Sequence, residues 1–232
     1  MIPIRDTQRT RNTPIVNWIL ILANVFAFCL EYFLPVNLSN WFVSTFSLIP
    51  ARISLSQPLS LLTFVTHMFL HGSWYHLISN VWFLMVFGDN IEDRLGPKRY
   101  LLFYLLGGVN AGLLQFFFAS DLTVPTLGAS GAIAAVMGAY FVLYPGSRVV
   151  TFIPIFFFGG FIRLPAIVYL GIWFVMQLFS GFSSFVIGSS TAAGGVAWWA
   201  HIGGFLFGML FVRLFQKKDP TTYIDMGQQY DR

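Results

Sequence analysis

Hydrophobic residues along the chain are grouped into six long stretches that short polar segments separate. The stretches cover residues 15–34, 75–90, 100–119, 127–144, 164–182 and 197–215. Each approaches the roughly 20 residues that a helix needs to cross the hydrocarbon core of a bilayer. A helix pairs its backbone polar groups within one segment, as lipid requires, whereas strands of a membrane barrel would alternate polar and apolar residues. The pattern therefore predicts an all-α fold with six transmembrane helices.

Three further segments are poor candidates for membrane spans. Residues 59–70 form an apolar run that is too short to cross, and we expect a re-entrant or interfacial segment there. Residues 149–162 contain a proline and two glycines, which favours a hairpin at the cytoplasmic interface over a seventh span. Residues 183–195 carry no charge and are rich in Gly, Ser, Ala and Thr, so we expect a mobile outer loop.

The composition narrows the class of protein. Of the 232 residues, 56% are hydrophobic and only 9% are charged, whereas soluble domains carry about 25% charged residues. This difference excludes a soluble enzyme and a disordered chain. The net charge of +4 comes from scattered bases without a basic stripe, which argues against nucleic-acid binding. The single cysteine, Cys29, excludes an internal disulfide framework and a cysteine-based metal site.

The positions of Lys and Arg predict the orientation of the helices. With six spans and both termini in the cytoplasm, every Lys and Arg except Arg52 lies on the cytoplasmic side, as the positive-inside rule requires. We therefore expect a cytoplasmic N-terminal arm at residues 1–14, a six-helix transmembrane domain at residues 15–215 and a cytoplasmic tail at residues 216–232. The polar N-terminal arm lacks the apolar core of a cleaved signal peptide.

Four polar residues fall at one depth when this orientation is applied. His76 and Asn80 lie in the first turns of the second predicted helix, Ser130 opens the fourth and His201 opens the sixth. All three helices enter from the outer side, and polar groups inside a membrane are costly enough to suggest a function. A serine, a histidine and an amide at one level supply the nucleophile, the base and the oxyanion donor of acyl transfer.

The local spacing favours the same chemistry, although each feature also has a structural explanation. His76 and Asn80 are four residues apart and share a helix face. Ser130 lies at a helix N-terminus, where free N–H groups favour an oxyanion. Small residues that allow close helix approach flank the serine and follow the histidine: Gly128, Gly131, Gly204 and Gly208. Small residues more often serve packing, and single histidines more often serve structure, so the residues alone leave both interpretations open.

At these same positions the sequence resembles the rhomboid family of intramembrane serine proteases. The GxSG motif of that family implies that Ser130 is the nucleophile, and its AHxxGxxxG motif implies that His201 is the base. Its HxxxN motif implies that His76 and Asn80 stabilise the oxyanion together with the backbone N–H of Ser130. The resemblance covers roughly residues 62–208 and implies the compact six-helix bundle of bacterial members.

The resemblance also implies the reaction and the partners. We expect a serine endopeptidase that hydrolyses peptide bonds in or beside the transmembrane helices of single-span or multi-span membrane-protein substrates. Its setting would be the lipid bilayer of a bacterial inner or plasma membrane, with no nucleic acid, no metal and no other cofactor. By the same resemblance His67 and His71 are largely structural, the loop at residues 183–195 caps the site, and the fifth helix swings to admit the substrate.

The surroundings of the histidine depart from the family pattern. Ala134 stands where some members have a tyrosine that stacks on the histidine, so we expect other aromatic residues such as Trp198 or Trp199 to brace it. The candidate carboxylates lie at span ends or in a loop: Glu31, Asp89, Glu92 and Asp121. We therefore expect a Ser130–His201 dyad. The fifth helix also carries polar residues, which we interpret as hydrogen-bonded structural groups more readily than as residues that control substrate entry: Gln177, Ser180 and Ser184.

Three alternative functions stay open at this point. A metalloprotease would use His67, His71 and His76, but the segment lacks the glutamate of an HExxH motif. A non-catalytic membrane-protein binder would resemble the inactive rhomboid relatives, which typically lose the serine or the histidine. A small-solute transporter is disfavoured because internal repeats and membrane-buried carboxylates are not evident.

Overall fold

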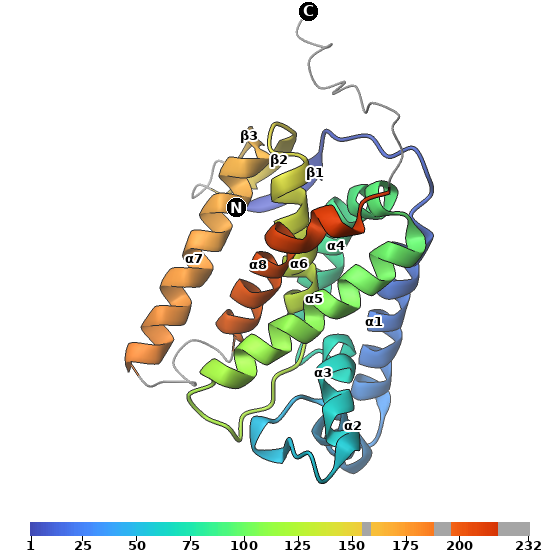
Figure 1. Cartoon of the computed structure of the whole chain (residues 1–232), viewed down its shortest axis with the longest axis vertical. Coiled ribbons are helices and arrows are strands. Elements are labelled where there is room, and N and C mark those ends of the chain that lie inside the picture. Colours follow the sequence, from blue (N-terminus) through green and yellow to red (C-terminus); the bar gives the residue numbers. More distant parts are fainter. Residues whose placement is uncertain (155–158, 188–195, 218–232) are drawn as a thin grey trace, which may run out of the picture.

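The computed structural model describes residues 1–154, 159–187 and 196–217, and the described fold is mostly helical (Figure 1). The long helices are α1 (Ile15–Phe33), α4 (Trp74–Leu95), α5 (Pro97–Phe118), α6 (Ser130–Leu143), α7 (Ala166–Ile187) and α8 (Trp198–Phe215). Shorter helices are α2 (Val36–Phe46), α3 (Thr63–Thr66) and the 3-10 turns η1 (Pro50–Arg52), η2 (Pro58–Leu62) and η3 (His67–Phe69). Three strands complete the described elements: β1 (Ile2–Asp6), β2 (Arg148–Ile153) and β3 (Gly160–Pro165).

The six long helices follow the six predicted stretches, and four of them meet the length and composition of a membrane span. These four are α1, α5, α7 and α8. Helix α6 has only 14 residues, and α4 carries polar groups such as His76, Asn80 and Asp89. The chain is thus a multi-pass membrane protein. Of the two long helices that do not meet the criteria of a span, α6 is too short and α4 carries several polar residues.

Helix α6 forms the centre of the bundle, because residues 131–140 are all buried and α6 contacts α4, α5, α7 and α8. Its contact with α8 is the most extensive between any two described elements. A Cβ atom added to Gly204 would lie 2.0 Å from the carbonyl oxygen of Gly131, and one added to Gly208 would lie 2.0 Å from that of Ala135. The two backbones therefore touch, and this brings the starts of α6 and α8 side by side.

A three-stranded antiparallel sheet lies at one end of the bundle, and α2 and α3 lie at the other (Figure 1). Residues 148–153 and 160–165 pair as a hairpin, in agreement with the predicted hairpin, and β1 of the N-terminal arm adds the third strand. The prediction of an all-α fold is therefore wrong in this respect. The reason is that β1 pairs with a strand more than 140 residues away, and a local sequence pattern carries no information on such a pairing. Pro3 is compatible with this arrangement because β1 is an edge strand.

Two other segments differ from the expectation or extend it. The run at 59–70 folds as the short turns η2, α3 and η3, and α2 precedes it as a helix that the sequence did not predict. The predicted mobile loop at 183–195 begins inside α7, which extends to Ile187. The remainder of that loop, residues 188–195, and most of the expected cytoplasmic tail lie outside the described residues.

Asp6 fastens the N-terminal strand to the helices. Its carboxyl accepts hydrogen bonds from the Tyr140 hydroxyl and from Asn90 Nδ2, the latter at 2.8 Å. Burial, with a smaller contribution from nearby Asp89, raises the pKa of Asp6 from 3.8 to about 7. The carboxyl is therefore protonated in the folded protein at pH values where it is ionised in the unfolded chain.

We expect the free energy of unfolding to decrease between about pH 4 and about pH 7 because of Asp6. Over this range the folded state holds a proton that the unfolded state has lost, which costs up to about 1.4 kcal/mol per pH unit, and the effect ends above pH 7. Asp6→Asn should flatten this slope. Thermal unfolding of both proteins in detergent, measured from pH 4.5 to pH 8, tests the expectation, which equal slopes would contradict.

Candidate active site

Ser130 is the first residue of α6, and the preceding loop holds it in place. Gly128 has a φ of +124°, a conformation that favours glycine, and its N–H donates to the carbonyl of His67 at 2.9 Å. A Cβ atom at Gly128 would also lie 2.6 Å from the ring of His76. Glycine is therefore required here twice, for the backbone turn and for the approach of the His76 ring to the serine loop.

His201 lies in the first turn of α8 and contacts the serine directly. Its Nε2 atom is 2.8 Å from Ser130 Oγ. Its other ring nitrogen, Nδ1, is 2.8 Å from Oε1 of Gln177 in α7. The imidazole is thus hydrogen-bonded at both nitrogens, on one side to the nucleophile candidate and on the other to an amide.

Two tryptophan side chains lie beside this imidazole, as expected from the presence of Ala134 in the first turns of α6. The Trp173 ring lies 5.7 Å from it at an angle of 38°, and the Trp198 ring meets it edge-on at 6.2 Å. Of the two tryptophans expected to brace the imidazole, Trp198 does contact it. Trp199 instead stacks on Phe118, with ring centroids 4.4 Å apart.

His76 and Asn80 lie one turn apart on α4, and both line the same cavity as Ser130 and His201. The Ser73 hydroxyl caps α4 by accepting the His76 backbone N–H at 3.2 Å. Asn80 is buried, and its Nδ2 finds no hydrogen-bond partner among the described residues. An amide donor without a partner at the edge of this cavity is available for an oxygen atom of a ligand.

The cavity has a volume of about 690 Å³ and lies at the end of the bundle opposite the sheet. Apolar side chains among its lining residues include Phe83, Ile133, Met137 and Trp173. The starts of α4, α6 and α8 and the end of α5 border it. The four predicted site residues therefore converge on one cavity, which is large enough for several residues of an extended peptide.

The two upstream histidines have structural contacts. His67 is buried with Nδ1 2.8 Å from the carbonyl of Thr63. The backbone N–H of His71 donates to the Glu31 carboxylate at 3.1 Å, which ties this loop to α1. Within the part of the chain that the structure describes, no group of three His, Cys, Asp or Glu residues is arranged to hold a metal ion.

The four carboxylates considered from the sequence make other contacts. Glu92 accepts the backbone N–H groups of Val16 and Asn17, and Asp121 accepts from Thr123. The partner of His201 Nδ1 is the neutral amide of Gln177, which the sequence suggested as a satisfied polar group more readily than as a gate residue. Gln177 and Trp173 are four residues apart in the fifth stretch, and this spacing was the available signal that both share the face toward α8.

Similarity to known proteins agrees with the motifs. A sequence model of the rhomboid domain matches residues 58–218. The mitochondrial presenilin-associated rhomboid-like proteins of Bos taurus and Homo sapiens are both 30% identical to this chain over 219 residues, which cover 88% of the chain and 51% of each relative. The chloroplastic rhomboid-like protein 11 of Arabidopsis thaliana is 41% identical over 70 residues, which cover 30% of the chain and 25% of that protein.

The chain spans about half the length of the mitochondrial relatives that it matches. The domain match covers more than half of the chain and includes every residue of the cavity motifs. It confirms the family that the GxSG, HxxxN and AHxxGxxxG motifs predicted. The chain therefore belongs to the rhomboid family.

Proposed function

We propose that the protein is an intramembrane serine endopeptidase in which Ser130 is the nucleophile and His201 is the base. The observation that carries this proposal is the 2.8 Å contact between Ser130 Oγ and His201 Nε2 inside a cavity. A serine hydroxyl is a weak nucleophile until an adjacent base accepts its proton, and this contact is within the reach that such a transfer needs.

The first half of the reaction follows from these positions. His201 Nε2 accepts the Ser130 proton while Oγ attacks the scissile carbonyl carbon. The negative charge that develops on the carbonyl oxygen is stabilised by the Ser130 backbone N–H, free at the helix N-terminus, and by Asn80 Nδ2. His76 supplies a further polar group at the same edge of the cavity.

The second half returns the enzyme to its starting state. The protonated His201 gives its proton to the leaving amine, and the peptide bond breaks to leave an acyl ester on Ser130. Water then enters the cavity, loses a proton to His201 and hydrolyses the ester. The reaction requires no metal and no organic cofactor.

The substrates that we propose are single-span or multi-span membrane proteins, because the cavity belongs to a multi-pass membrane protein of the rhomboid family. A helical substrate has to unwind before its peptide bonds reach Ser130. Segments that contain glycine are expected to unwind with less cost than segments of strong helix formers. Because we propose that the cavity faces the outer side of the membrane, the cleavage site should lie near the outer end of the substrate helix.

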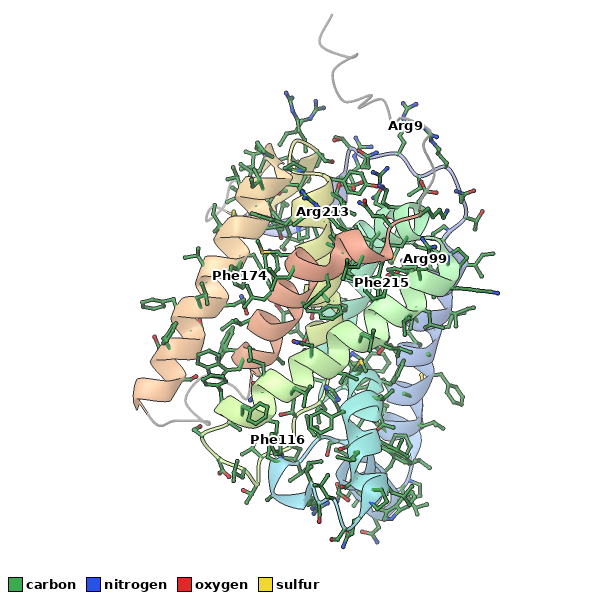
Figure 2. The ribbon with its side chains drawn as sticks, in the orientation of Figure 1. Arg9, Arg99, Phe116, Phe174, Arg213 and Phe215 are labelled. Carbon is green, nitrogen blue, oxygen red and sulfur yellow. The ribbon has the colours of Figure 1, made fainter. Side chains whose placement is uncertain are left out.

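The proposed topology has six spans, formed by the four apolar helices together with α4 and α6. Both termini are then cytoplasmic, with the arm at residues 1–14 and the tail at 216–232 on either side of the transmembrane domain at 15–215. Arg9, Arg99 and Arg213 lie toward the end of the bundle that holds the sheet, and Phe116 lies toward the other end (Figure 2). This distribution supports a cytoplasmic sheet and an outward-facing cavity, and the membrane that we propose is a bacterial plasma membrane.

Purified protein in liposomes, mixed with a model single-span substrate, tests the proposal. We expect cleavage that a chelator leaves unchanged, together with covalent labelling by a fluorophosphonate that peptide mass spectrometry assigns to Ser130. Cleavage that the chelator removes would favour a metalloprotease. A protein that neither cleaves nor takes the label would favour a non-catalytic binder.

Asn80→Leu is expected to lower kcat about 100-fold or more while KM changes little, because the amide acts on charge that exists only in the transition state. Steady-state kinetics with the same substrate measures both constants. Asn37→Leu makes the same chemical change at an exposed position of α2 and serves as the matched control. A loss confined to KM would contradict the proposed role of Asn80 and indicate ordinary substrate binding instead.

A further inference from the structure

Gln177 is a buried polar side chain that the Ser130–His201 chemistry leaves without an assigned role. It comes from α7 and is only 6% exposed. Its Oε1 atom lies 2.8 Å from His201 Nδ1, and its Nε2 donates to the carbonyl oxygen of Trp173, one turn earlier in α7, at 3.2 Å. Both ends of the amide are therefore engaged.

These two contacts define which way the amide points. The Trp173 carbonyl can only accept a hydrogen bond, so the side-chain atom of Gln177 that faces it has to be the NH₂ group. The oxygen of the amide then faces His201 and can only accept. His201 Nδ1 must therefore carry the ring proton, and Nε2 presents its lone pair to the Ser130 hydroxyl.

We propose that Gln177 is a positioning residue for the reaction and extends the Ser130–His201 pair to a hydrogen-bonded group of three. It holds His201 in the tautomer and the ring orientation in which Nε2 can accept the serine proton, and Trp173 holds Gln177. This inference rests on the proposed function of the site. It assigns to a neutral amide the place that a carboxylate takes in serine hydrolases with three catalytic groups.

The neutrality of the amide suits its surroundings. A buried carboxylate beside His201 would have to be desolvated, whereas an amide with both ends hydrogen-bonded costs much less to bury. These hydrogen bonds also join three helices, because Ser130 belongs to α6, His201 to α8, and Gln177 and Trp173 to α7. Phe174, also in α7, stacks on Phe205 of α8 at 4.5 Å and lies between the two helices in Figure 2.

The position of α7 against α8 therefore determines whether Gln177 and Trp173 contact the His201 imidazole. Towards its C-terminal end α7 stands away from α8 (Figure 1), and Val175, Met176 and Phe179 are exposed on its outer face. The Trp173, Phe174 and Gln177 contacts lie where the two helices are still in contact. A displacement of α7 would remove the amide and one aromatic brace from His201 at the same time.

Two substitutions test the proposal with the full-length protein and a single-span substrate. Gln177→Leu should lower kcat by about 10-fold to 100-fold and leave KM within about twofold, because the ring is no longer held for proton transfer. It should slow fluorophosphonate labelling of Ser130 by a similar factor. Gln177→Glu should retain activity and move the acidic limb of the pH–rate profile to higher pH, because a carboxylate next to Nδ1 stabilises the imidazolium.

Met176→Leu, on the exposed face of the same helix, is the matched control and should match the wild type in all three measurements. The other titratable side chains that line the cavity among the described residues are Tyr75, His76 and Asp121, and every variant keeps them. Wild-type kcat in Gln177→Leu would overturn the proposal. So would an unmoved acidic limb in Gln177→Glu, which decides the matter if the leucine variant fails to fold. Failure of the proposed function is distinct, since the wild type itself would then neither cleave nor label.

Discussion

Ser130→Ala is expected to lower the rate of cleavage of a single-span substrate by at least about 10⁴-fold. The alanine variant keeps the cavity, the His201 imidazole and the oxyanion donors, but it has no oxygen atom that can attack the scissile carbonyl. Any residual rate would come from water that the remaining groups orient. Substrate should still bind, so a pull-down with labelled substrate should recover the variant as well as the wild type.

His201→Ala should be almost as severe, and the double variant should be no worse than either single one, because the two groups act in a single proton transfer. Ser44→Ala, in α2 and outside the residues that line the cavity, is the control for loss of a hydroxyl. The assay is mass spectrometry of the cleaved substrate after reconstitution. Unchanged cleavage by Ser130→Ala would refute the proposed mechanism, and multiplicative effects in the double variant would show that the two residues act independently.

The convergence of the four polar residues was predictable because membrane topology carries long-range information. The alternation of helix direction placed Ser130 and His201 at one depth, although 71 residues separate them in the chain. The same argument placed His76 and Asn80 beside them. In a soluble protein the sequence offers no equivalent of the membrane plane, and depth could not have been inferred so simply.

Other parts of the molecule were not predictable because they depend on contacts between particular distant residues. Gln177 looked like one of several polar residues in the fifth stretch, and only the packing of α7 on α8 brings its amide to His201. The pairing of β1 with β2 likewise depends on tertiary structure, since an isolated five-residue segment rich in charge carries a weak strand signal. The hydrogen bonds from Tyr140 and Asn90 to Asp6, which help to hold this strand, join residues 134 and 84 positions apart in the chain.

The close contact of α6 with α8 leads to the second large effect. Gly208→Ala is expected to destabilise the protein by about 3 kcal/mol, although it adds only one methyl group. That methyl would lie 2.0 Å from the Ala135 carbonyl oxygen and 2.8 Å from the Ala139 nitrogen. Both neighbours are backbone atoms of a buried helix, so they cannot move aside as a flexible side chain would. The helices must separate by about 1 Å to accept it.

This separation should also reduce activity, although Gly208 lies nearly two turns from His201 and touches no substrate. Ser130 and His201 sit on the two helices that are forced apart, and a misplacement of about 1 Å is enough to cost on the order of 100-fold in rate. Thermal unfolding and fluorophosphonate labelling measure the two consequences separately. Gly146→Ala is the matched control, because an added Cβ there meets nothing within 4 Å. If the two alanine variants were equally stable, the backbone contact of α6 with α8 would not be as close as described, and the 2.8 Å distance between the serine and the histidine would need another cause.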